Sequence, residues 1–451
     1  LNVEQLTAAP VLNFGLDDYY QWRRQWLNRK FDVRGAWDAQ NQTLRIDFST
    51  RHPARAPAAD QPAMADFHLR SYFLSALDPL PESFIEYTTD ASKVSRNVFG
   101  AAMDSRLIAR TNLRDAKACL AMRRTARLGP GESATWRYAV GYGTADDAVA
   151  LHAKYAHDVP PQRAARVYFE TPGLPWLTRE LAWHSYYLQA GSVYSDFFKA
   201  HFVDQGSAYA YLQGLSGAPR DFMLYTLPMV YLRPDLAKDM LRFSMRLQDT
   251  STGALPYALA GYGKSRGYVV HSHSSDLDLF LLWGLAEYLG ATRDLDFLDE
   301  RLAFYPPDKG VDGTVLEHAQ AAFRHLRERV GLGPHGIIRC GTGDWNDVLL
   351  GFSRFSPLTV WRGESSLNAG LATVALPALA DALEEADARF ASDLRAYADA
   401  QGKALEQLWT GDWLARGYLG YGDKQLGRDR LFLDTQAFPV LGGLWPRDRA
   451  R

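Results

Sequence analysis

Hydrophobic and polar positions alternate in the first third of the chain, and this pattern changes near residue 145. The alternation occurs in short runs separated by turn residues, which predicts half-buried strands. The runs are TLRIDFST (43–50), SFIEYTT (83–89), SRLIARTNL (105–113) and WRYAVGYG (136–143), while the Pro/Ala-rich segment 53–64 is expected to be a loop. Several short strands without intervening helices predict a β-sandwich domain over residues 1–148.

From about residue 145 the apolar positions recur with a helical period. The run ADDAVALHAKYAHD (145–158) predicts an amphipathic helix that leaves the sandwich, and residues 149–172 are interpreted as a helical linker. Residues 173–451 predict a helical domain, with helices at 175–190, 219–232, 234–248, 275–290, 313–330, 365–385 and 388–409. The long glycine-rich connections between them are typical of the functional face of a helical repeat. Pro377 is expected to kink or shorten the helix that contains it.

Charge and composition exclude several classes of partner. Lys and Arg number 50 against 52 Asp and Glu, so no basic face is expected and nucleic acid is not a predicted partner. The sequence contains no run of about 18 apolar residues, so no membrane span is predicted. Two cysteines, Cys119 and Cys340, are too few for a disulfide framework, which indicates a reducing compartment and predicts a cytoplasmic protein. The chain begins at Leu1, which is compatible with an upstream segment that has been removed.

Aromatic content is the compositional feature that points toward a ligand. The chain is 13% aromatic, with 12 Trp and 23 Tyr. Indole and phenol rings stack on the flat C–H faces of sugars, so this content is compatible with carbohydrate binding. Large hydrophobic cores also use aromatic residues, and composition alone favours that interpretation.

The most unusual local sequence is GTGDWND, residues 341–347, which we call the glycine-rich loop. Glycosidic bonds are cleaved by a carboxylic acid whose pKa is raised by burial or neighbouring charge. An Asp beside a Trp on a loop between helices supplies an acid and a stacking wall, and the glycines allow close approach of the backbone. The alternative is an Asx-turn that caps the next helix.

Two further clusters carry candidate chemistry. Arg220 and Asp221 begin a predicted helix, where they either bind sugar hydroxyls or act as an ordinary helix-terminal acid and a surface arginine. His271, His273 and Asp276 enter an apolar helix, but no further ligand pattern supports a metal site, and none is predicted. The chain contains no serine-hydrolase elbow, phosphate-binding glycine loop or dinucleotide fingerprint.

Taken in order, these segments resemble glycoside hydrolase family 94, which includes cellobiose and chitobiose phosphorylases and one domain of cyclic β-1,2-glucan synthases. GTGDWNDVL is similar to the family signature Gly-Asp-Trp-Asn-Asp-Gly-Met. The other similar segments are APRDFMLYTLPMVYLRPDLAK, SSDLDLFLLWGLAEYLGATRDLDFLDE, GES (363–365) and FLDTQAFPVLGG (432–443). The resemblance covers about residues 170–445.

The resemblance implies an α+β multidomain protein with an N-terminal β-sandwich, a helical linker and an (α/α)6-barrel-like catalytic domain. A toroid of six helical hairpins has twelve helices, and we expect roughly eight or nine after the linker, so the barrel is expected to be incomplete at the C-terminus. The resemblance further implies inverting phosphorolysis of β-linked gluco-oligosaccharides, with inorganic phosphate as co-substrate and no cofactor. A homodimer is expected from the resemblance alone.

Site residues follow from the matched motif positions. Asp347 would be the general acid and Trp345 a wall of the donor-sugar subsite. The other expected substrate-binding residues are Arg220, Asp221, Asp276, Asp344, Glu364 and Gln436.

The chain departs from the family pattern at three motif positions and at the phosphate site. Leu224, Tyr225 and Leu277 replace a Gln and two Asp residues of the family motifs. The family has an Arg shortly before Arg-Asp, but residues 192–219 contain only Lys199 and His201 as basic residues. An inverting hydrolase or transglycosylase therefore stays open, with Asp221, Asp276 and Glu364 as candidate bases. A non-catalytic sugar-binding homologue is the third alternative.

Overall fold

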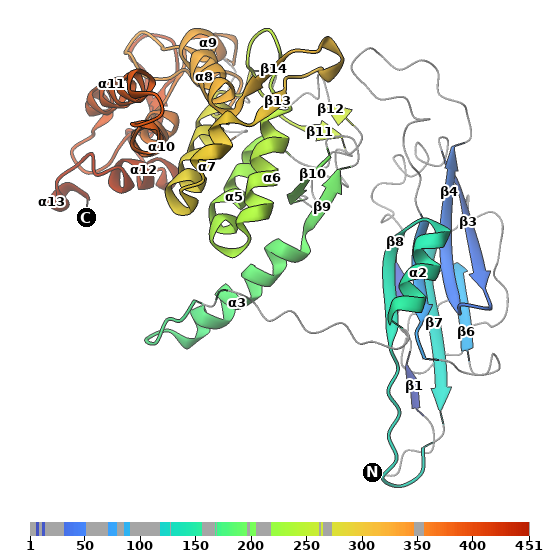
Figure 1. The fold of residues 1–451 in the computed structure, drawn as a ribbon. Coiled ribbons are helices and arrows are strands. Elements are labelled where there is room, and N and C mark those ends of the chain that lie inside the picture. The colour runs from blue at the N-terminus through green and yellow to red at the C-terminus, as the bar shows by residue number, and fades with distance from the viewer. Residues whose placement is uncertain are drawn as a thin grey trace. The chain divides into compact units, whose positions relative to one another are not determined.

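The computed structural model describes residues 6–8, 11–13, 31–50, 71–78, 85–90, 118–126, 128–155, 167, 169–195, 199–203, 218–260, 263–264, 273–346 and 356–450 (Figure 1). The chain forms two compact units, residues 1–164 and residues 165–451. The division lies inside the predicted linker, residues 149–172. The predicted strand at 105–113 and the predicted loop at 53–64 lie outside the described residues.

The first unit contains two antiparallel sheets. In one sheet the strand order is β3-β4-β5-β8, and in the other β7 pairs with β1, β2 and β6. The strands are β1 (Leu6–Ala8), β2 (Val11–Asn13), β3 (Phe31–Asp38), β4 (Thr43–Thr50), β5 (Ser71–Ala76), β6 (Ile85–Asp90), β7 (Ala118–Ala126) and β8 (Tyr138–Gly143). The predicted strands at 43–50, 83–89 and 136–143 are confirmed as β4, β6 and β8.

Alternate residues of β4, β5 and β7 form the core of the first unit. Because successive side chains of a strand point to opposite faces, each strand contributes every second residue. The cluster consists of Leu44, Ile46, Leu74, Ala76, Leu120 and Met122. Trp37 of β3 also stacks on Tyr87 of β6, with ring centroids 4.1 Å apart. The two sheets therefore share one core, while the complete β-sandwich over residues 1–148 stays a prediction.

Helix α2 (Ala145–Tyr155) is the one predicted to leave the sandwich. It packs against β8 and β5 of the first unit, and Ala148 is its buried residue. The side chain of Asp147 accepts hydrogen bonds from the backbone and hydroxyl of Thr144, which caps the first turn. This helix is therefore part of the β unit over its described length.

The second unit is built from helices that follow the predicted ranges closely. They are α3 (Pro175–Ala190), α5 (Pro219–Leu232), α6 (Pro234–Met245), α7 (Leu277–Thr292), α8 (Val315–His325), α9 (Ser356–Arg362), α10 (Ser366–Leu383), α11 (Ala388–Leu405), α12 (Ala437–Leu441) and α13 (Arg447–Ala450). A π turn (Leu326–Val330) extends α8, and 3-10 turns lie at Leu295–Asp299, Pro307–Lys309, Glu406–Leu408 and Leu433–Thr435. The seven helices predicted from periodicity are confirmed, with ends that differ by a few residues. α10 continues through Pro377.

Short strands connect the helices of the second unit. They are β9 (Ser192–Ser195), β10 (Ala200–Val203), β11 (Leu259–Ala260), β12 (Gly263–Lys264), β13 (Arg301–Ala303), β14 (Asp312–Thr314), β15 (Glu364–Ser365), β16 (Gly417–Tyr418) and β17 (Gln425–Leu426). The last three form one antiparallel sheet in the order β15-β16-β17. This small sheet joins the start of α10 to residues 417–426.

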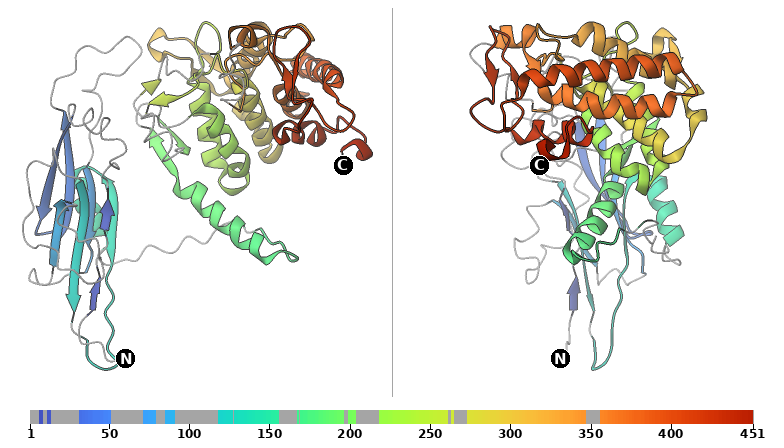
Figure 2. Two further views of the ribbon diagram at one scale, coloured as in Figure 1. Left: turned by 180° about the vertical axis from the view of Figure 1, so that it is seen from behind. Right: turned by 90° about the vertical axis from the view of Figure 1, so that its left-hand side faces the viewer.

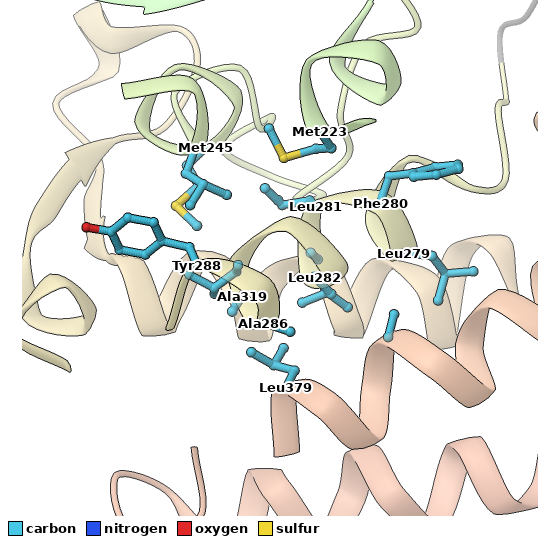
Figure 3. Packing of buried hydrophobic residues seen from close by; sticks show 14 of the residues in the cluster. Met223, Met245, Leu279, Phe280, Leu281, Leu282, Ala286, Tyr288, Ala319 and Leu379 are labelled. Carbon is cyan, nitrogen blue, oxygen red and sulfur yellow. The ribbon is translucent and has the colours of Figure 1, made fainter. Parts of the chain in front are cut away.

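Helix α7 is the centre of the helical core. Its sequence LDLFLLWGLAEYLGAT is apolar on nearly all sides, which is typical of a buried helix. It packs against α5, α6, α8 and α10 (Figure 1), and Figure 3 shows Leu281, Leu282 and Ala286 facing residues of these neighbours. Gly284 permits close approach of α5, because an added Cβ would lie 2.9 Å from Met223 Sδ. Helices α5, α6, α8 and α10 are therefore held together by one core around α7.

Helices α10 and α11 lie side by side, as the right-hand view of Figure 2 shows in orange and red. Among the described residues, α10 is the one helix long and apolar enough to cross a membrane, and 72% of that window is buried in the protein. Its composition is that of a core helix.

The cytoplasmic location and the homodimer stay predictions.

Helix α3 differs from the other long helices, because its aromatic side chains are largely exposed. Trp183 and Tyr187 are 57% and 63% exposed in this structure. Ser185 is the buried residue of the helix, and Leu188 packs against the edge of the helical core.

Replacing Leu282 by alanine is expected to lower the free energy of unfolding of the helical unit by about 2–5 kcal/mol. Leu282 is fully buried in α7, so the substitution removes apolar contacts and leaves a cavity. Urea denaturation followed by far-ultraviolet circular dichroism measures the change. Leu441→Ala is the control, because Leu441 is 68% exposed and its truncation should change stability by less than about 0.5 kcal/mol. Equal effects of the two substitutions would contradict the central position of α7.

Candidate active site

The glycine-rich loop lies directly against the segment that precedes α7. The Thr342 N–H donates to the carbonyl of His273 at 3.0 Å, and the Ser275 N–H donates to the carbonyl of Gly343 at 3.1 Å. Gly341 has a φ of +60°, and an added Cβ would lie 2.2 Å from the His273 carbonyl oxygen. Glycine is therefore required at this position both for its backbone conformation and for close approach of the two segments.

On its other side, the segment of residues 338–340 that leads into the loop bonds to the segment that precedes α10. The Cys340 N–H donates to the carbonyl of Gly363 at 2.8 Å, and the Ser365 N–H donates to that of Ile338 at 2.9 Å. Strand β15 continues this pairing to β16. The loop is thus held between the starts of two core helices, α7 and α10, by backbone hydrogen bonds.

Arg220 and Asp276 form a buried ion pair beside the loop. Arg220 lies in the first turn of α5, and Asp276 directly precedes α7. The Arg220 Nε lies 2.8 Å from Asp276 Oδ2, and Nη2 lies 3.2 Å from Oδ1. Arg220 Nη1 donates to the carbonyl of Trp345 at 3.3 Å, and the Ser274 hydroxyl donates to Asp276 at 3.0 Å. The structure therefore brings together three predicted site residues from three separate segments.

Asp344 is the buried anchor of the glycine-rich loop. Its two carboxylate oxygens accept hydrogen bonds from Arg416 Nη2 at 2.6 and 2.7 Å, and one also accepts from the Ser365 hydroxyl at 2.6 Å. Burial alone would raise the pKa of Asp344, but the Arg416 guanidinium and the Ser365 hydroxyl hold that pKa below its ordinary value. The Asn346 N–H donates to Asp344 Oδ1 at 3.0 Å, which fixes the direction of the chain after the anchor.

Glu364 is also fully buried and is held by the segment that leads to the loop. Its Oε1 accepts from the N–H groups of His335 and Ile337 at 2.9 and 3.1 Å, and His335 Nδ1 lies 2.5 Å from Oε2. The imidazole stacks on Tyr418, with centroids 3.5 Å apart, and its Nε2 lies 3.2 Å from Asp423 Oδ1. Burial lowers the pKa of His335, but the contacts with Glu364 and Asp423 raise it by more. The pKa of His335 therefore lies above its ordinary value.

Gln436 lies near the C-terminus and bonds to backbone groups. Its Oε1 accepts from the Leu414 N–H at 3.0 Å, and its Nε2 donates to the Leu414 carbonyl at 2.9 Å and to the Phe432 carbonyl at 2.8 Å. The side chain therefore joins the segment before Arg416 to the segment before α12.

The remaining predicted residues differ in how far the structure describes them. Trp345 is 48% exposed, so its indole can contact a ligand, and Asp221 is half-buried in the first turn of α5. The predicted acid, Asp347, lies outside the described residues, immediately after Asn346.

The positions that depart from the family pattern contribute to packing. Leu277 is 4% exposed in the helical core, and Leu224 and Tyr225 pack against the same core. His201, one of the basic residues before Arg220, pairs with Asp239 of α6, with Nδ1 at 2.7 Å from Oδ2. His201 is therefore already paired with a carboxylate of α6.

Metal binding receives no support from the described part of the chain. His273 is exposed and has a ring contact with Trp361, while His271 lies outside the described residues. No group of three His, Cys, Asp or Glu side chains suited to a metal ion occurs among the residues described.

Four supporting residues were not predicted from the sequence. Ser275 donates its hydroxyl to the Cys340 carbonyl at 2.7 Å and accepts from Asn368 at 2.8 Å, which ties α10 to the segment before α7. Arg416 and His335 hold Asp344 and Glu364 as described above. A single Arg or His within a mixed sequence has no recognisable spacing, and only the rule that buried charges are paired would have suggested partners for them.

The second unit is thus a helical domain whose buried charged pairs support an exposed Trp on a glycine-rich loop. The chain belongs to the glycosyl hydrolase 94 superfamily, because the model of its catalytic domain matches residues 181–451. This confirms the family resemblance of the sequence motifs. The match includes every predicted site residue.

Three characterised relatives are similar to parts of this chain. Solabiose phosphorylase of Paenibacillus borealis is 31% identical over 170 residues, which cover 36% of this chain and 21% of the relative. A 3-O-β-D-glucopyranosyl-β-D-glucuronide phosphorylase of the same organism is 26% identical over 181 residues, with 39% and 22% covered. Cellobionic acid phosphorylase of Neurospora crassa is 26% identical over 233 residues, with 50% and 28% covered. The matched region thus spans less than a third of the length of each relative.

The ion pair of His335 is expected to stabilise the protein in a pH-dependent way. The folded-state pKa of His335 is raised above 6.5, so its contribution is fully present below the unfolded-state value and is lost as the pH rises through the folded-state value. The difference in unfolding free energy between the wild type and His335→Gln should therefore shrink above pH 6.5. Urea denaturation at several pH values measures it.

His184→Gln is the matched control for this measurement. His184 is exposed on α3 and lies beside Glu180, so its replacement should have little effect at any pH. A difference for His335→Gln that does not change with pH would show that the charged form of the imidazole is not stabilised by Glu364.

Proposed function

We propose that this chain carries the catalytic domain of an inverting glycoside phosphorylase that acts on β-linked gluco-disaccharides or oligosaccharides. In this reaction Asp347 protonates the glycosidic oxygen as the bond from that oxygen to the anomeric carbon breaks. An oxygen of inorganic phosphate attacks the anomeric carbon from the opposite face. The products are a sugar 1-phosphate of inverted configuration and the released sugar. Phosphate is the co-substrate, and no cofactor takes part.

The observation that carries this proposal is the contact between Arg220 and the glycine-rich loop. Arg220 bonds both to Asp276 and to the carbonyl of Trp345, two residues before Asp347. A donor sugar that stacks on Trp345 would present its hydroxyls to charged groups of this cluster, and hydrogen bonds to charged groups are the strong ones. The three relatives named as phosphorylases support phosphate as the attacking group.

The predicted substrate-binding residues fall into two groups by their hydrogen bonds. Arg220, Asp276 and Trp345 are assigned to the sugar subsite because Arg220 contacts the other two, and Asp221 is assigned with them because it follows Arg220 in the first turn of α5. Asp344, Glu364 and Gln436 bond instead to Arg416, His335 and Leu414, which lie outside this cluster. We assign to these three the support of the loop and its neighbouring strands, without direct contact to substrate. The complete (α/α)6 barrel belongs to the same proposal.

An inverting hydrolase or transglycosylase is the second candidate, and it requires a carboxylate base about 6.5–9.5 Å from the acid. Asp276 is bound to Arg220, and Glu364 is buried against His335. Both oxygens of each carboxylate are already engaged by these partners, so neither carboxylate is placed to take a proton from a water molecule. Asp221 remains the candidate base for this alternative. A sugar-binding protein without activity is the third alternative.

Phosphate-dependent cleavage separates the first two candidates. We expect a panel of β-linked gluco-disaccharides to include one that releases a sugar 1-phosphate only when inorganic phosphate is present. Product formation is measured by enzymatic assay of glucose 1-phosphate and of free glucose. Cleavage at the same rate without phosphate would contradict phosphorolysis and favour the hydrolase. Binding of a disaccharide without any cleavage would favour the third alternative.

Replacing Asp347 by asparagine is expected to lower kcat/KM for the cleaved disaccharide by at least about 100-fold, because the leaving oxygen then lacks its proton donor. Asp412→Asn is the matched control, since Asp412 is an exposed acid on a loop of the same unit. Its activity should equal that of the wild type. Retained activity in Asp347→Asn would contradict the assignment of the acid.

A further inference from the structure

Among the described residues of the helical unit, Arg416 is the most deeply buried arginine or lysine, and no sequence motif singled it out. It immediately precedes β16, and its side chain is fully inaccessible. Its N–H donates to the carbonyl of Leu426 at 2.8 Å, and its carbonyl accepts from the N–H and hydroxyl of Ser366 at 3.3 and 2.8 Å. The backbone of Arg416 is therefore fixed to β17 and to the first residue of α10.

The guanidinium of Arg416 lies between two carboxylates from distant parts of the chain. Nη2 contacts both oxygens of Asp344 in the glycine-rich loop, and Nε lies 3.2 Å from Asp434 Oδ2. The Asp434 side chain is 17% exposed, whereas those of Asp344 and Arg416 are fully buried. An arginine in such surroundings stays charged, so it compensates the Asp344 carboxylate at every accessible pH.

A short covalent and hydrogen-bonded path leads from Arg416 to the part of the loop that contains the exposed Trp345. Arg416 orients the Asp344 carboxylate, and Asp344 Oδ1 accepts from the Asn346 N–H. This Asx-type contact fixes the backbone from Asp344 to Asn346, the residue that precedes Asp347 in the sequence. Displacement of a catalytic group by about 1 Å is sufficient to lower a rate by about 100-fold.

We propose that Arg416, held by Asp434, is a positioning residue that fixes residues 344–346 of the glycine-rich loop through Asp344, in the segment from which the chain continues to the proposed acid. The inference rests on the proposed function. In this role Arg416 does not touch substrate and acts only through Asp344. Lysine in its place keeps the positive charge, but its single nitrogen cannot reproduce the arrangement in which Nη2 contacts both oxygens of Asp344 while Nε faces Asp434.

A leaving-group series tests this role by kinetics. Poor positioning of the acid lowers the cleavage rate most when the leaving oxygen needs full protonation. It lowers the rate least when the leaving group is an acidic phenol. Arg416→Lys should therefore lower kcat/KM about 100-fold for the natural disaccharide and about tenfold or less for an aryl β-glucoside with a strongly acidic phenol. A loss of properly folded enzyme would lower both rates by the same factor, and that result would overturn the proposal.

Amide hydrogen exchange tests the same role without reference to activity. Peptides that cover residues 341–346 should exchange faster in Arg416→Lys than in the wild type, while peptides from the core of α7 should not change. Arg430→Lys is the matched control, because Arg430 forms an exposed pair with Asp429 in the same region. Unchanged exchange in the loop would overturn the positioning role.

The two readouts also separate failure of this inference from failure of the proposed function. If the wild type cleaves no glycoside, the proposed function fails, and exchange alone then decides whether Arg416 holds the loop. If Arg416→Lys does not fold, Asp434→Asn provides the test, because it removes the second carboxylate and leaves the pair with Asp344 in place. It should give the same selective loss at a smaller magnitude, and equal losses on both substrate types would overturn the proposal.

Discussion

The ion pair between Asp344 and Arg416 is the interaction on which the candidate site depends. Both side chains are fully buried, and removing one partner of such a pair typically costs about 3–5 kcal/mol because an uncompensated charge remains. A pair of this kind contributes little net stability compared with apolar residues of the same volume. The pair joins the loop to the segment before β16, and the Ser365 hydroxyl links the start of α10 to the same Asp344 carboxylate.

Apolar packing and polar anchoring have separate tasks in the helical unit. The core around α7 fixes where the helices begin, and thereby places Arg220 and Asp276 opposite each other. Backbone pairing then brings the glycine-rich loop between the starts of α7 and α10. Asp344 holds the loop through Arg416, and Glu364 holds the segment that precedes the loop through His335 and Ile337, while Trp345 stays exposed. The exposed chemistry is therefore supported by residues that do not themselves reach the ligand.

Periodicity predicted the helices because an apolar stripe such as that of α6, or an apolar surface such as that of α7, is a local property of sequence. The pairing of Arg220 with Asp276 across 56 residues is not local, and neither is that of Asp344 with Arg416 across 72 residues. The motif resemblance identified three of these four residues by type and assigned all three to substrate binding. Their burial and their partners in the folded chain are not visible in a motif. Arg416 belongs to none of the motifs that resemble the family.

The starts of α5, α7 and α10 meet at the candidate site, and this shared orientation has an electrostatic consequence. Each helix directs the positive end of its dipole toward the same place, equivalent to about half a unit charge per helix. Asp221, Asp276 and the residues Glu364 and Ser365 lie at or just before these ends. The backbone thus supplies a positive potential that stabilises the carboxylates gathered at the starts of these three helices. An anionic co-substrate that approaches this face would meet the same potential, even where few basic side chains surround it.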